Sequence, residues 1–445
     1  MPADIHGQMA TPTPAIGGRL DGLTILRFAR AYESGGGLEG HLADLNRALA
    51  TRNRIATIQL QLTDDPERLA PVERCLGSSR LLTVPLLVLA RIQTDTRPAW
   101  LTKAKCRALD VLLSTPRLNS LAMRQLSRWR AVPRKVGEAD DAGTTAAELI
   151  RRFKVDLVVL HACGGADVSD IIEAAESTRV PLAIVHHFSN DRLGDVSARQ
   201  QVSRVDGVAG ASWVGVPSYL RTSFSNLSDA VDTAFYSRER ARPVPTDVRG
   251  PVLYAPGRLT PEKGQTDVIE VAFKLRQRGL NPMVLFAGRA DSPEFQAHLH
   301  RLVAERRLSD CVRFLGSLSL EEYRDWYCAA HVMVMPTRHS EGMPRTLIES
   351  QAMKVPPVVY DIGGTREGVR HRETGFVTTY GDVEEMTQAV ERLLREPDLQ
   401  RSMAEAGRRF VDRTFSLQML AERHEDFYAR VLARAGAQPS AIGPS

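Results

Sequence analysis

The sequence predicts an α/β protein built from two doubly wound domains that face a shared cleft. Short apolar runs alternate with amphipathic helical patterns along most of the chain, as parallel strands alternate with crossover helices. The alternation occurs twice, on either side of a charged, proline-containing stretch at 238–250. At 445 residues the chain is also too long for a single hydrophobic core.

The first series contains the strands that we expect in the N-terminal domain. A glycine-rich turn at 35–37 follows the first of them and precedes a periodic helix, at the position where an open α/β sheet lets a backbone approach a ligand. The turn is not G-x-G-x-x-G, so by itself it is more typical of a flexible turn. The expected strands cover residues 23–28, 55–60, 155–160, 181–185, 208–209 and 214–216.

The second series is more regular and predicts a complete C-terminal domain. Its expected strands cover residues 252–255, 283–287, 312–315, 332–335 and 358–360. Its expected helices cover residues 266–278, 293–307, 320–328, 383–395, 397–414 and 416–433.

These patterns predict the division of the chain. We expect a disordered leader at 1–20, an N-terminal domain at 21–237, a linker at 238–250, a C-terminal domain at 251–415, a helix at 416–433 that packs back toward the N-terminal domain, and a disordered tail at 434–445. The leader lacks a basic start and an apolar h-region, so we do not expect a secretory signal.

Composition predicts a cytoplasmic protein. Hydrophobic residues make up 43% of the chain and charged residues 25%, as in soluble globular proteins. The longest mainly apolar run, at 81–90, is too short to span a bilayer. Five cysteines without a C-x-x-C pair indicate reduced thiols rather than disulfides or a zinc site.

A basic segment lies between residues 74 and 135, with thirteen Lys or Arg against two acids, Asp95 and Asp110. Leucines and two tryptophans accompany the charge, so the segment could lie on the inner face of an anionic membrane or bind an acidic acceptor. A solvated helical face that is merely basic explains the pattern equally well. We expect no nucleic-acid partner, because no recognition-helix, zinc-finger or RNA-binding signature accompanies the charge.

The stretch 331–368 carries the clearest chemistry. A buried strand ends at Pro336, a polar loop follows, and a helix starts near Pro344. Glu341 lies in the loop and Glu349 about one and a half turns into the helix. A helix N-terminus suits phosphate, and each carboxylate can accept a pair of sugar hydroxyls, which together suit a nucleotide-sugar. The E-x7-E spacing alone is more typical of an ordinary βαβ unit with solvated glutamates.

Histidines follow two strands of the first series, at His161 and at the pair His186 and His187. Ligands of open parallel sheets bind outside the carboxyl ends of the strands, so these side chains lie where chemistry is expected. A satisfied core histidine explains His161 about as well.

The order of motifs in the second half resembles the retaining, nucleotide-sugar-dependent glycosyltransferases of family four, which have the GT-B fold. The resemblance covers nearly all of 252–428. It rests on GRLTPEKG at 257–264, LFAGRAD at 285–291, VRFLGSLSLEEYRDWYCAAHVMVMPT at 312–337, SEGMPRTLIESQA at 340–352 and PVVYDIGGTREGV at 357–369. In the first half, DAVDTAFY at 229–236 resembles the family's N-G-V-D-x-x-x-F hinge, with Asp-Ala in place of Asn-Gly and Tyr236 in place of Phe.

The resemblance implies roles for individual residues. Arg258 and Lys263 match the basic pair that grips the donor diphosphate, Glu349 the acid that accepts the ribose hydroxyls, and Glu341 the acid near the donor sugar. His187 matches the histidine near the sugar hydroxyls, although its neighbour His186 leaves the register open. The implied donor-binding set also includes Gly36, Gly37, Gly288, Arg313, Gly342, Met343, Pro344, Arg345, Thr346 and Leu347.

The resemblance thus implies transfer of a hexose from a nucleoside diphosphate to a hydroxyl of a glycan or lipid-linked acceptor, with retained anomeric configuration. We find no D-x-D motif, so we expect no metal and no other cofactor, and side chains must neutralise the leaving group. An epimerase or sugar phosphorylase of the same fold, or a silent nucleotide-sugar-binding partner, remains an alternative. The sequence does not identify the base or sugar of the donor.

Overall fold

The structure is a computed structural model that describes residues 20, 22–29, 37–52, 56–61, 84–85, 146–161, 166–187, 196–244 and 250–436. Gly36, nearly all of the basic segment, the end of the expected linker, and almost all of the expected leader and tail lie outside them.

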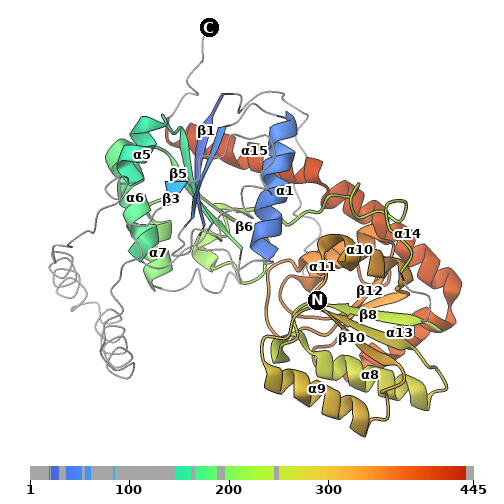
Figure 1. Cartoon of the computed structure of the whole chain (residues 1–445). Helices are drawn as coiled ribbons and strands as arrows, with labels where there is room; N and C mark the ends of the chain where they lie inside the picture. Colours follow the sequence, from blue (N-terminus) through green and yellow to red (C-terminus); the bar gives the residue numbers. More distant parts are fainter. Residues whose placement is uncertain are drawn as a thin grey trace, which may run out of the picture.

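The N-terminal domain contains a seven-stranded parallel sheet with the order β3-β2-β1-β4-β5-β6-β7 (Figure 1). Its strands are β1 (Thr24–Ala29), β2 (Ala56–Gln61), β3 (Val84–Pro85), β4 (Leu157–Leu160), β5 (Leu182–His186), β6 (Gly207–Gly210) and β7 (Phe224–Asn226). Its helices are α1 (Gly37–Arg52), α5 (Ala146–Arg152), α6 (Ala166–Thr178), α7 (Val196–Val202) and the 3-10 turn η4 (Ser218–Leu220). Strands β4 to β6 are buried along their whole length, as parallel strands covered on both faces should be.

The C-terminal domain contains a six-stranded parallel sheet with the order β10-β9-β8-β11-β12-β13. Its strands are β8 (Val252–Pro256), β9 (Met283–Ala287), β10 (Val312–Gly316), β11 (Val332–Met335), β12 (Pro357–Tyr360) and β13 (Phe376–Thr378). Its helices are η5 (Pro261–Lys263), α8 (Gln265–Gln277), α9 (Pro293–Glu305), α10 (Leu320–Ala329), α11 (Arg345–Ala352), α12 (Thr365–Gly368), α13 (Val383–Arg395) and α14 (Pro397–Thr414).

Each sheet reverses its strand order once, between β1 and β4 in the first and between β8 and β11 in the second. Loops at such a reversal diverge to opposite faces and leave a crevice at the carboxyl ends of the strands, where doubly wound proteins bind ligands. The reversal in the C-terminal sheet lies between the loops 257–264 and 336–344. The predicted α/β class with two Rossmann-like domains is therefore confirmed.

One expected strand, at 214–216, is wrong. The chain turns there, and the last strand of the sheet is β7 instead. The backbone N–H of Val214 donates to the hydroxyl of Ser212 at 3.0 Å and to Glu367 of the other domain at 3.2 Å. In the same turn, the N–H of Val216 donates to the Trp213 carbonyl at 3.3 Å instead of pairing with a neighbouring strand.

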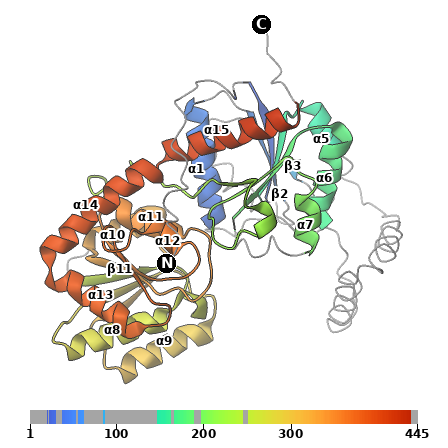
Figure 2. The ribbon, with the colours of Figure 1, turned by 180° about the vertical axis from the view of Figure 1, so that it is seen from behind.

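The two domains share elements across the expected boundary. Val231 and Tyr236 pack in the C-terminal core, although they precede the expected linker. In the opposite direction, α15 (Leu417–Arg434) follows α14 and packs on α1, β5 and β6 of the N-terminal domain. Figure 2 shows α14 and α15 running along both domains in succession.

Charged side chains fix the end of α1 to α15. Arg52 donates to Glu425 at 3.0 Å and to Glu422 at 3.2 Å. Beneath these ion pairs, Phe427 and Val431 lie against Gly207 at the start of β6. Among the described residues, no helix has the length and apolar character needed to cross a bilayer.

The contact of α15 with β6 predicts a steric coupling. A Cβ atom at Gly207 would lie 2.5 Å from Cγ2 of Val431. Gly207→Ala should therefore lower the free energy of unfolding by about 1–3 kcal/mol through overpacking, and Val431→Ala by a similar amount through a cavity. The double variant should lose at least about 0.5 kcal/mol less than the sum, because each change relieves the other. Urea unfolding measures all three.

The control pairs Gly207→Ala with Val390→Ala, which lies in the C-terminal core and should give additive losses. Additive losses for Gly207→Ala and Val431→Ala would show that α15 does not lie on β6.

Candidate active site

The loops after β8 and β11 are tied together at the point where the strand order reverses. Gly264 has φ of 71°, and a Cβ there would lie only 2.0 Å from the carbonyl oxygen of Pro336, so only glycine permits the contact. The carbonyl of Glu262 accepts from the backbone N–H of Arg338 at 2.7 Å and from the hydroxyl of Thr337 at 3.2 Å. These contacts hold Lys263 beside the loop that carries Glu341.

Lys263 and Glu341 form an ion pair between these two loops, and each side chain is 24% exposed. Glu341 also accepts from the Thr337 hydroxyl at 3.3 Å. A second ion pair joins Arg258, whose side chain is 60% exposed, to Asp291. Each cation of the predicted basic pair is therefore neutralised by a carboxylate that remains within reach of solvent.

Two further glycines allow close backbone contacts that support these loops. A Cβ at Gly288 would lie 2.1 Å from the carbonyl oxygen of Gly257. Likewise, a Cβ at Gly364 would lie 2.1 Å from the carbonyl oxygen of Gly342, and the Gly364 N–H donates to the Glu341 carbonyl at 3.0 Å. Larger residues at these positions would displace the loops.

Arg345 opens α11 and reaches into the other domain. Its guanidinium donates to Asp44 of α1 at 2.7 Å and lies 3.9 Å from Asp229 and 3.8 Å from Glu349. Burial lowers the pKa of Arg345, but the three carboxylates outweigh burial and raise it above its ordinary value. The side chain therefore clamps α11 to α1.

Glu349 is 6% exposed in the same buried group of charges. Burial raises the pKa of its carboxyl, while Arg345 and the Tyr236 hydroxyl oppose the rise by favouring the charged form. The tyrosine in place of the family's phenylalanine thus brings a phenol to the predicted ribose acid.

The first turn of α11 offers backbone rather than side chains. Pro344 is the N-cap, and no side chain in the described part of the chain caps the helix, which leaves N–H groups for a ligand. Met343 and Leu347 are buried in the C-terminal core. The hydroxyl of Thr346 donates to the sulfur of Met335 at 3.3 Å.

Some predicted site residues lie elsewhere. Arg313 is the second residue of the edge strand β10, so the structure does not bring it to the carboxyl-end loops. Gly37 is the first residue of α1, and Gly36 precedes the described part of that segment.

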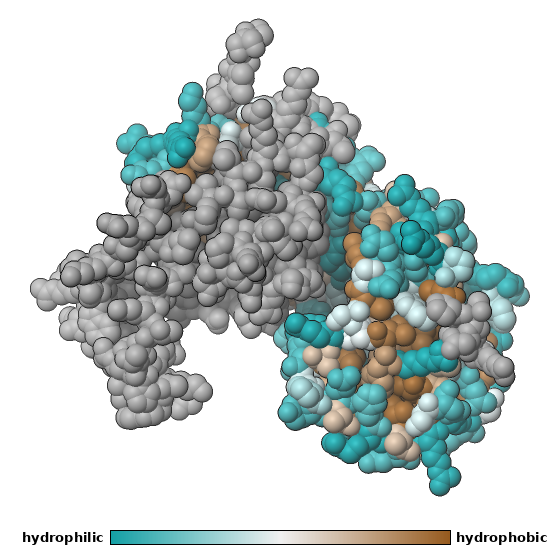
Figure 3. Space-filling model, in the orientation of Figure 1, coloured by the Kyte–Doolittle hydropathy of each residue, from teal (hydrophilic) through white to brown (hydrophobic). Residues whose placement is uncertain are grey.

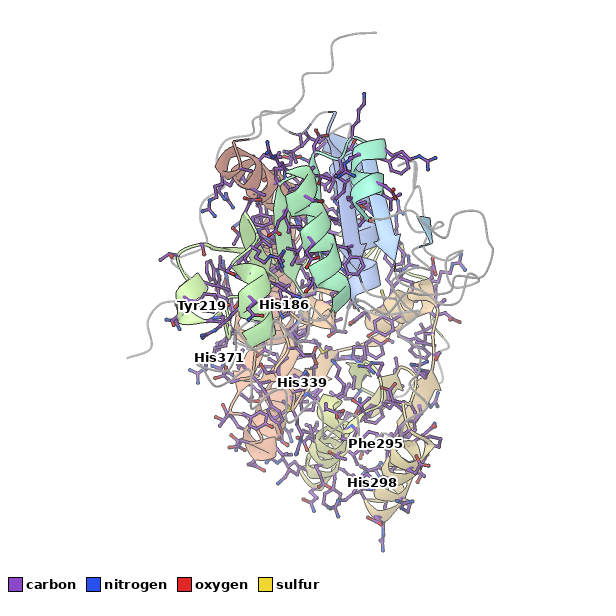
Figure 4. The ribbon with its side chains drawn as sticks, turned by 90° about the vertical axis from the view of Figure 1, so that its left-hand side faces the viewer. His186, Tyr219, Phe295, His298, His339 and His371 are labelled. Carbon is purple, nitrogen blue, oxygen red and sulfur yellow. The ribbon has the colours of Figure 1, made fainter. Side chains whose placement is uncertain are left out.

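His187 turns toward the reversal point of the N-terminal sheet. Its Nε2 lies 2.8 Å from Nδ1 of His161, and its ring centroid lies 4.6 Å from that of His41 on α1. His186 is the last residue of β5 and is 2% exposed. This arrangement favours His187 over His186 for the ligand side. Figure 4 shows His186 and, from the loop after β11, His339 on facing domains.

The histidines form a buried group that is completed by His424 of α15, whose ring centroid lies 5.9 Å from that of His41. Burial lowers the pKa values of His161, His187 and His424 well below the ordinary value, and neighbouring histidines lower them further. Arg27 and Asp229 also face the group, and His41 bonds Asp229. The rings of His161, His187 and His424 are therefore neutral at pH 7.

Several structural partners were not predicted as site residues. Asp44 and His41 lie on α1 with no motif to mark them, and Glu367 follows a pair of glycines whose role is visible only in three dimensions.

Within the described ranges, no three His, Cys, Asp or Glu side chains are grouped to hold a metal ion. Figure 3 shows hydrophilic side chains around the rim of the C-terminal domain and hydrophobic ones toward its middle.

Comparisons with known proteins agree with this geometry. Residues 237–410 match the family described as "Glycosyl transferases group 1". The chain is 31% identical over 185 residues to the alpha-D-kanosaminyltransferase of Streptomyces kanamyceticus, covering 42% of this chain and 47% of the relative. It is 28% identical over 238 residues to a GDP-mannose-dependent alpha-(1-6)-phosphatidylinositol monomannoside mannosyltransferase of Mycobacterium tuberculosis, covering 48% and 60%.

A solved structure shares the fold over nearly the whole chain. Anabaena HepE in complex with UDP has a TM-score of 0.67 at 16% identity, covering 92% of this chain and all of that one. By sequence, the chain spans about half the length of the curated relatives it matches.

The two parallel sheets and the matched solved structure define the GT-B fold. Residues 237–410 match a glycosyl transferases group 1 domain, in agreement with the resemblance of that half of the sequence.

The histidine group predicts acid sensitivity. The unfolded chain takes up protons as the pH falls through about 6.5, whereas the folded group does not, so stability should fall as the pH falls below that value. Each histidine contributes up to about 1.4 kcal/mol per pH unit. His424→Phe should remove one such contribution and flatten the dependence between pH 6.5 and 5.5, measured by urea unfolding.

His298→Phe is the control, because His298 is exposed on α9 (Figure 4). An unchanged slope in His424→Phe would mean that His424 is not held neutral.

Proposed function

We propose that the protein is a retaining hexosyltransferase that moves a sugar from a nucleoside diphosphate to a hydroxyl acceptor without a metal ion. The observation that carries the proposal is the Lys263–Glu341 ion pair at the reversal point of the C-terminal sheet, with Glu349 eight residues after Glu341. The pair combines a phosphate-binding cation with an acid that suits sugar hydroxyls.

When the donor binds, its diphosphate replaces the carboxylates as the partner of the two cations. A diphosphate carries more charge than one carboxylate, so it competes successfully for Lys263 and, at the exposed outer position, for Arg258. Glu341 is then released beside the diphosphate, where it accepts hydroxyls of the transferred sugar. The uncapped first turn of α11 adds N–H groups and the positive end of the helix dipole.

The nucleoside lies toward Glu349. A carboxylate accepts both ribose hydroxyls only in its charged form, and Arg345 favours that form despite burial. Arg345 itself stays paired with Asp44, so it orients the ribose acid without leaving α1.

Bond cleavage places charge on the departing β-phosphate. Fixed cations and helix N–H groups stabilise that charge, and they need no rearrangement during the reaction. The β-phosphate accepts the acceptor's proton on the same face, so the anomeric configuration is retained and no carboxylate nucleophile is required. Closure of the domains brings His187 toward the sugar.

The acceptor in this proposal is a glycan or a lipid-linked sugar, met at the inner face of an anionic membrane. Two observations support it. The similar mycobacterial protein is described as acting on a phosphatidylinositol monomannoside, and the segment 74–135 is strongly basic. A thermal-shift screen of UDP-, GDP- and ADP-sugars identifies the donor, because a ligand that binds only the native state raises the melting temperature.

Loss of the central cation should abolish most turnover. With the donor from that screen, Lys263→Ala should lower kcat/KM about a hundred- to a thousandfold, since one partner of the developing charge is lost. Initial rates are measured with EDTA present, and the product's anomeric configuration is read by NMR.

Lys274→Ala is the matched control, because Lys274 pairs with Glu384 on the outer helices α8 and α13. It should change kcat/KM less than about twofold. Near-normal turnover in folded Lys263→Ala, inversion of configuration, or a requirement for added metal would each contradict the corresponding part of the proposal.

A further inference from the structure

Glu367 of α12 is a buried carboxylate whose hydrogen-bond donors come from the other domain. Its Oε1 accepts from the Ser212 hydroxyl at 2.7 Å, from the N–H of Trp213 at 2.8 Å and from the N–H of Val214 at 3.2 Å. Its Oε2 accepts from Nδ2 of Asn226 at 3.1 Å. The side chain is 6% exposed, and the contact joins the C-terminal domain to the turn after β6 and the end of β7.

The groups of the N-terminal domain that bind Glu367 are oriented by hydrogen bonds within their own domain. The side-chain oxygen of Asn226 accepts from the N–H of Ser228 at 2.9 Å and from its hydroxyl at 3.0 Å. The amide is thus oriented with Nδ2 toward Glu367. The Ser212 hydroxyl is itself 2.7 Å from the carboxylate and also accepts from Val214. Such convergent donors are complementary to an anion and not to a neutral amide.

The other end of α12 supports the loop that carries Glu341. The N–H of Glu367 donates to the Gly364 carbonyl, and the N–H of Gly364 donates to the Glu341 carbonyl, both at 3.0 Å. A Cβ at Gly363 would lie 2.4 Å from the carbonyl oxygen of Glu341. Two hydrogen bonds therefore lead from Glu367 to the backbone of the acid beside Lys263.

We infer that Glu367 is a positioning residue, which sets the Glu341 loop against the N-terminal domain so that groups from both domains meet at the donor sugar. The inference rests on the proposed transferase function for its kinetic consequence. In that proposal Lys263, Arg258, the first turn of α11 and Glu349, which bind the nucleoside diphosphate, all belong to the C-terminal domain. Loss of the Glu367 contact therefore lowers turnover and leaves nucleotide affinity nearly unchanged.

Arg345 provides a second tie between the domains, from the first residue of α11 to Asp44. The segment from Glu341 to Glu349 is thereby held against the N-terminal domain from two directions. Because the donors to Glu367 belong to the N-terminal domain, the carboxylate keeps them only while the domains are docked. Burial raises the pKa of this carboxyl, as expected for an acid removed from water.

The test is a double-mutant cycle on the fixed amide. Glu367→Gln points an N–H₂ group at Nδ2 of Asn226, and Asn226→Asp points a carboxylate at Glu367, so each single variant creates a mismatch. The double variant restores a donor opposite an acceptor.

We expect each single variant to lower kcat about ten- to a hundredfold, with the dissociation constant for the nucleoside diphosphate changed less than about twofold. The double variant should recover kcat to within about threefold of the wild type.

Amide hydrogen exchange gives a readout that does not depend on activity. The amides of Trp213 and Val214 should exchange at least about threefold faster in either single variant and return to the wild-type rate in the double variant. Glu373→Gln, an exposed change in the same region, is the control and should alter neither readout.

Unchanged exchange in Glu367→Gln, failure of the double variant to recover, or a parallel loss of nucleotide affinity and kcat would each overturn the inference. A wild-type protein that transfers no sugar would instead overturn the proposed function. In that case the exchange rates alone decide whether Glu367 docks the two domains.

Discussion

The Lys263–Glu341 ion pair is the interaction on which the rest of the site depends. It joins the two loops that diverge where the C-terminal sheet reverses, and each of its side chains is 24% exposed to water. Ion pairs of this exposure contribute little to stability. The two charged groups lie at the usual ligand position of the fold. We therefore interpret them as a pair that a charged ligand separates, and not as a structural support.

Shape and charge complement each other around this pair. Glycines at 264, 288, 363 and 364 let backbone segments approach more closely than any side chain would allow. These close contacts fix the positions of the loops. The cations in front remain partly exposed. The cross-domain contacts of Arg345 and Glu367 then connect this rigid loop to the domain that carries His187. The proposed donor site and the contacts between the domains thus share the same short segment.

Strand and helix positions could be predicted because burial imposes a visible period on the sequence. Helices α13 and α14 have the predicted bounds, and β9 and β11 do as well. The predicted loops of the C-terminal crevice also follow from strand order. The expected strand at 214–216 failed because a turn forms there, fixed partly by the contact of the Val214 N–H with Glu367, 153 residues away, which periodicity does not reveal. Asp44 and Glu367 were missed for the same reason, since their partners lie 301 and 155 residues away.

The most direct test of the central claim is the affinity of the Glu341→Gln variant for the free nucleoside diphosphate, measured by calorimetry beside the wild type. If the carboxylate competes with the diphosphate for Lys263, removing its charge should tighten binding of the sugar-free nucleotide about two- to tenfold. It should do so while transfer of the sugar is lost. Weaker or unchanged nucleotide binding in the folded variant would show that the ion pair does not occupy the diphosphate position.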